Sequence, residues 1–162
     1  MADDTLHDLI RDLSRSLIVS VAPEEVRLFG PLSAAYYRDP AAATRARKER
    51  DEVLGFGVEA AAVIATPIVL SVVTDVVRHL TQRLVADAGE HGAQVAERGV
   101  QALLQRARSP EAVPSVPGLT EAQLREVRER AYEKARELRL SDARSALLAD
   151  ALVGSLSASS TA

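Results

Sequence analysis

Hydrophobic residues recur every three or four positions along most of this chain, and charged residues fill the positions between them. This spacing is typical of amphipathic α-helices that bury one face. It predicts a first helix over residues 4–20, followed by a short helix that begins at Pro23 and ends before Gly30 and Pro31. The pattern as a whole predicts an all-α fold, a helical bundle around a kinked apolar central helix with a C-terminal αα-hairpin.

The centre of the chain departs from this alternation. Residues 53–77 carry only two charges, Glu59 and Asp75, and fifteen consecutive residues between them, 60–74, are uncharged. Such a segment must be covered by a protein core, by a subunit interface or by a bilayer. A spanning helix needs about 20 apolar residues, so the uninterrupted segment is short for that purpose.

Pro67 divides the apolar segment. Proline inside a helix removes one backbone hydrogen bond and crowds the preceding turn. We therefore expect two apolar helical halves, residues 53–65 and residues 67–85, with Pro67 as the first residue of the second half and Thr66 as its N-cap.

Glycines and prolines mark the joints of the second half of the chain. Gly89 and Gly92 predict a joint between two amphipathic runs, because each glycine costs a helix about 1 kcal/mol relative to alanine. The second run, which includes Val95, ends at Ser109 and Pro110. We expect a helical body over residues 1–108, a Pro-rich linker over 109–118, a helical hairpin over 119–154 and a disordered tail over 155–162.

The hairpin has the clearest local signals. Thr120 and Gln123 stand at the spacing of a capping box, which predicts the start of a helix. A last helix is expected from Asp142 to residue 153, with Leu147 among its buried residues and Gly154 as its C-terminal stop.

Composition excludes several classes of site. The chain has no cysteine, which excludes disulfides and thiolate metal sites. Its three histidines, His7, His79 and His91, stand in no catalytic or metal-binding motif, so we expect surface or structural roles for them. The sequence therefore predicts no catalytic residue, no cofactor, no metal site and no small-molecule substrate, and we expect a protein that is not an enzyme.

Charge does not favour nucleic-acid binding. The formal net charge is −3, which supplies no field to attract phosphates. Ala135, Leu140 and Leu148 are spaced as in a helix-turn-helix, but residues 120–156 hold seven basic and seven acidic side chains. A recognition helix should present a positive face, and this region is electrically neutral.

Three pieces of the chain carry a resemblance: APEEVRLFGPLSAAYYRDP, EVLGFGVEAAAVIATPIVLSVV and LTEAQLREVRERAYEKARELRLSDARSALLADALVGSL. They resemble small all-helical proteins of actinobacteria, and the resemblance covers most of the chain. It implies a helical fold and carries no activity.

The function expected from these observations is non-enzymatic. We expect a helical interaction or assembly protein that binds a protein partner or a second copy of itself, since one very apolar helix needs several others to cover it. The candidate interface residues are apolar, and plain monomer core is the alternative role for them: Val63, Ile68, Leu70, Val73, Leu124, Val127, Leu147 and Leu148.

The competing interpretation places the same central segment in a lipid bilayer. Residues 53–77 would then serve a membrane-associated or conditionally inserting protein, such as an anchor, a toxin or a pore component. The N-terminus lacks a basic region followed by an apolar run, so we expect no secretory signal. The expected location is the cytoplasm, with contact to the inner membrane under the second interpretation.

Overall fold

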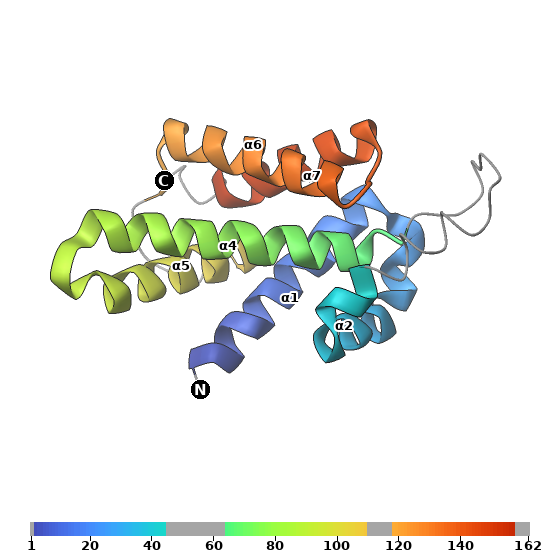
Figure 1. Cartoon of the computed structure of the whole chain (residues 1–162), viewed down its shortest axis with the longest axis horizontal. Coiled ribbons are helices and arrows are strands. Elements are labelled where there is room, and N and C mark those ends of the chain that lie inside the picture. The colour runs from blue at the N-terminus through green and yellow to red at the C-terminus, as the bar shows by residue number, and fades with distance from the viewer. Residues whose placement is uncertain (1, 45–63, 110–117, 158–162) are drawn as a thin grey trace.

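The computed structural model describes residues 2–44, 64–109 and 118–157, and over these residues the chain is an all-α bundle (Figure 1). No strand occurs in the described ranges. The α-helices and the two 3₁₀ helices, η1 and η2, have these bounds: α1 Ala2–Val21, η1 Pro23–Leu28, α2 Phe29–Arg38, α4 Thr66–Ala88, η2 Gly89–His91, α5 Gly92–Arg108, α6 Glu121–Glu137 and α7 Asp142–Ser157.

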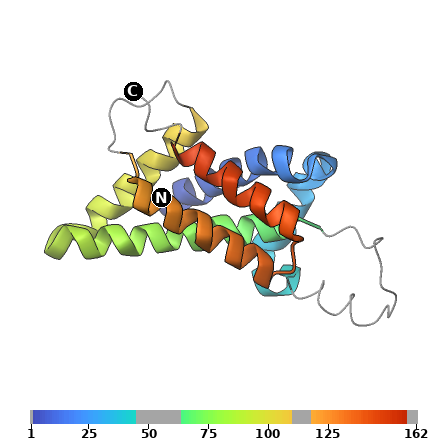
Figure 2. The same ribbon diagram turned by 90° about the horizontal axis from the view of Figure 1, so that it is seen from above.

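Helix α4 is the central element of the bundle. It extends along most of the molecule, with α5 beside it and α6 along another side (Figure 1). Helix α1 packs against α4 and α5, and α2 packs against α4. Helix α7 lies along α6 and also contacts α1, as the view from above shows (Figure 2).

The second half of the apolar segment is a buried helix. All large apolar side chains of residues 65–80 are buried, and helices of the same chain cover them. The expected helix start is nearly correct, because α4 begins at Thr66 with Pro67 in its first turn. The N-cap position belongs to Ala65 rather than to Thr66. Of the expected first helical half, residues 53–63 lie outside the described residues, and residues 64 and 65, which were expected to be helical, are not.

The joint between α4 and α5 lies where the two glycines predict it. Gly89 has a φ of 69°, a left-handed conformation that favours glycine. At Gly92 a Cβ atom would lie 2.6 Å from the backbone oxygen of Val85, so only glycine permits this close approach of the two helices.

The capping box of α6 is confirmed. The Thr120 hydroxyl accepts a hydrogen bond from the Gln123 N–H at 3.2 Å, and the Gln123 side chain accepts one from the Thr120 N–H at 2.9 Å. Between α6 and α7 the chain turns at Arg139, whose φ is 67°. The Leu140 N–H then bonds the Ala135 carbonyl at 3.0 Å and closes the end of α6.

The short helix expected to begin at Pro23 and to end before Gly30 is present as η1, Pro23–Leu28. Gly30 and Pro31 lie in the first turn of the next helix, α2, where proline's missing N–H is tolerated.

Two other local expectations were wrong. Leu147 was expected to be buried, and its side chain is 45 % exposed. Helix α7 does not stop at Gly154 but continues to Ser157, because Leu156 is still buried in the core.

Candidate functional site

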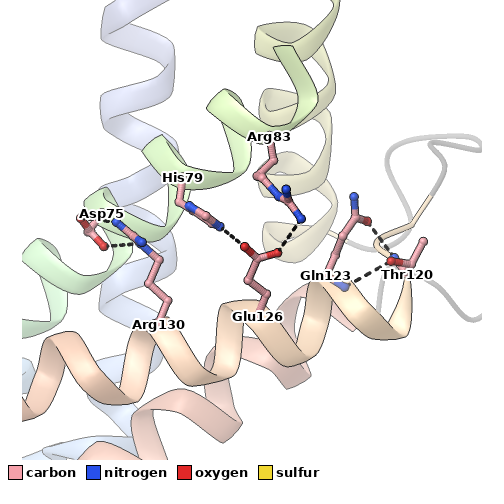
Figure 3. A network of polar contacts seen from close by, with 7 residues as sticks. All are labelled: Asp75, His79, Arg83, Thr120, Gln123, Glu126 and Arg130. Carbon is pink, nitrogen blue, oxygen red and sulfur yellow. Dashed lines mark hydrogen bonds and ion pairs between the residues drawn. The ribbon is translucent and has the colours of Figure 1, made fainter. Parts of the chain in front are cut away.

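A row of polar side chains joins α4 to α6 (Figure 3). Asp75, His79 and Arg83 are spaced four residues apart on α4 and therefore share one side of that helix. Glu126 and Arg130, also four apart, face them from α6. We call these five residues the α4–α6 seam.

Each contact in the α4–α6 seam joins a basic side chain to a carboxylate. Arg130 Nε lies 2.8 Å from Asp75 Oδ2, and His79 Nε2 lies 2.7 Å from Glu126 Oε1. The other oxygen of the same glutamate accepts a hydrogen bond from Arg83 Nη2 at 3.2 Å. Because the partner number falls along α6 as the number rises along α4, these contacts fix an antiparallel packing of the two helices.

Glu126 is held in its charged form. The hydrogen bond with His79 is the largest cause that lowers the pKa of this carboxyl, and the charge and hydrogen bond of Arg83 lower it further. The ring of His79 is mostly buried between the helices, with 17 % of its side chain exposed. The contact between His79 and Glu126 therefore holds α6 against α4.

A second polar cluster lies at η1. Both carboxylate oxygens of the buried Glu25 point at the start of α4, where they accept hydrogen bonds from the Ala65 N–H at 2.6 Å and the Thr66 N–H at 2.8 Å. The Thr66 hydroxyl donates a third bond at 2.6 Å. Because Pro67 has no N–H, this carboxylate satisfies the two backbone donors that precede it, at the positive end of the helix dipole.

The neighbouring carboxylate points elsewhere. Glu24 Oε1 accepts a hydrogen bond from Arg144 Nη2 of α7 at 2.7 Å. The pKa of Glu24 is lowered, first by a backbone hydrogen bond and then by this arginine. Two adjacent glutamates of η1 thus fix the positions of α4 and α7.

The remaining described features supply no other site. In the described ranges no group of three acidic or histidine side chains could hold a metal ion. An apolar void between α1, α4, α5 and α7 measures about 10 Å³, which is far below the 300 Å³ or more of a typical ligand pocket. Among the residues that the structure describes, no helix combines the length and the apolar character that crossing a bilayer requires.

The candidate interface residues fall into three environments. Five are buried inside the single chain, which is the monomer-core alternative: Ile68, Leu70, Val73, Val127 and Leu148. Leu124 is half-buried and Leu147 is exposed. Val63 lies outside the described residues.

The histidines are also placed. His79 belongs to the α4–α6 seam, and the His7 ring lies 3.7 Å from the Tyr37 ring, measured between centroids. The side chain of His91 is outside the described residues.

Comparison with known proteins adds no relative. No family model matches the chain, and neither a curated protein nor a solved structure matches it. The resemblance to helical proteins of actinobacteria therefore stays a prediction.

Sequence reasoning did not find either polar cluster. The α4–α6 seam had a usable signal, since Asp75, His79 and Arg83 stand four apart and the opposite charges Glu126 and Arg130 do too. The sequence held no signal for the contact of Glu25 with the start of α4, because this contact joins residues 40 positions apart.

Proposed function

We propose that this chain is a non-enzymatic helical protein that acts by binding a protein, and that a second copy of itself is the partner to test first. The observation that carries the proposal is the exposure of Leu147. This leucine is 45 % exposed on α7, whereas the adjacent Leu148 is fully buried. A partner that covers this side chain would remove its apolar surface from water, which favours association.

The ionisable groups of the two polar clusters are consistent with this proposal. A general base or nucleophile must be free to reach a substrate. In the α4–α6 seam and at η1, the histidine and the carboxylates hold helices together instead: His79 with Glu126, Asp75 with Arg130, and Glu25 with Thr66. In the proposed function, these groups hold together the helices that carry the binding surface.

The reason for expecting a second copy changes with the fold. The sequence suggested that one chain has too few helices to cover its apolar centre. Over residues 65–80 the chain's own α1, α2, α5 and α6 provide that cover. The proposal of self-association therefore rests on the exposed side chain of Leu147 on α7, and no longer on a lack of helices to cover residues 65–80.

The test is the mass of the full chain in solution. Sedimentation velocity and light scattering over a hundredfold range of concentration should give a mass that rises from that of the 17.3 kDa chain to a multiple of it. A mass that stays at 17.3 kDa throughout would contradict self-association.

The same preparation tests the membrane alternative. It should remain in the supernatant when mixed with vesicles of phosphatidylglycerol and phosphatidylethanolamine and centrifuged. Sedimentation with the vesicles that only detergent reverses would favour an anchor or pore component, in which residues 66–77 leave the core described above.

A further inference from the structure

We draw no further inference here: the strongest candidate, the exposed apolar surface at Leu28 on η1 and at Ile64 before the start of α4, carries none, because nothing in the part of the chain that the structure describes shows what covers it.

Discussion

Glu25 supplies the cap of the helix that Thr66 begins. Its carboxylate accepts hydrogen bonds from the backbone N–H of Thr66 at 2.8 Å and from the hydroxyl of the same residue at 2.6 Å. The N-cap residue, Ala65, has no side-chain oxygen to offer, and its own N–H bonds the same carboxylate. The start of α4 thus depends on a charged residue from a different element, η1.

Glu25→Ala should destabilise the fold strongly. The substitution leaves the two backbone donors and the Thr66 hydroxyl without their acceptor in a buried place, for which we expect a loss of about 3 kcal/mol or more in the free energy of unfolding. Urea denaturation followed by circular dichroism measures it.

Glu24→Gln is the matched control for that experiment. It changes the adjacent glutamate, which is exposed and bonds Arg144 instead. The control should stay close to the native midpoint. Equal losses in the two variants would contradict the capping role of Glu25.

Glu126→Gln should reduce the loss of stability in acid. The folded state lowers the pKa of Glu126, mainly through the hydrogen bond with His79. A lowered pKa stabilises the fold above the pKa of the unfolded glutamate, and this contribution is lost as the pH falls through the lower folded value. Native protein should therefore lose more stability than the variant between about pH 5 and about pH 3.

Two further variants make the acid experiment specific. Their stability is measured as the urea midpoint at about pH 5 and at about pH 3. His79→Gln should reduce the acid loss as well, because it removes the largest cause of the shift. Glu129→Gln changes an exposed glutamate on the same helix outside the α4–α6 seam and should behave as the native chain does. An acid loss that is identical in all four proteins would argue against the seam.

Gly92→Ala and Gly154→Ala should act in opposite directions. A Cβ at Gly92 would lie 2.6 Å from the Val85 oxygen, so α4 and α5 would have to separate, at an expected loss of about 2–4 kcal/mol. A Cβ at Gly154 meets nothing within 4 Å, and alanine should stabilise α7 there by about 0.5–1 kcal/mol. Thermal unfolding of both variants gives the comparison, and a destabilised Gly154→Ala would contradict the helix found at that position.

The Tyr37 hydroxyl should lose its proton at a higher pH than an ordinary tyrosine does. Burial raises the pKa of its hydroxyl to about 12. Because the folded pKa is raised, stability is retained below the ordinary tyrosine value and falls as the pH rises from about 10 toward 12. The chain has three tyrosines and no tryptophan, so absorbance at about 295 nm reports tyrosinate alone.

Tyr37→Phe should remove the late component of that titration, while Tyr132→Phe should leave it in place. At neutral pH Tyr37→Phe should keep the native stability, because the buried hydroxyl of Tyr37 has no hydrogen-bond partner in the described structure. A titration that is complete by about pH 11 would contradict the burial of this group.

Local signals in the sequence identified the elements of this fold. The capping box at Thr120 and the joint at Gly89 each depend on a few neighbouring residues, and each lies where it was expected. The start of α4 lies one residue before Pro67, the position that was expected. Local rules failed where packing decides the outcome. Leu147 and Val95 continue apolar patterns, yet in the part of the chain that the structure describes both side chains are exposed.

Contacts between helices could not be predicted in the same way. Whether Glu126 meets His79 depends on how α6 packs on α4, and residues 47 positions apart have no fixed relation in the sequence. The interface prediction shows the same limit. Periodicity identified Leu147 and Leu148 as apolar positions, and only the rotation of α7 on the bundle separates the exposed one from the buried one.

The contact of Glu25 with the start of α4 also bears on the order in which parts of the chain fold. Helices α4 and α5 are joined by a short turn, and so are α6 and α7, so each pair can assemble from contacts close in the chain. The first turn of α4 needs a carboxylate from 40 residues earlier, and closing so long a loop costs entropy. We expect this turn to form late in folding and to exchange its amide protons sooner than the middle of α4.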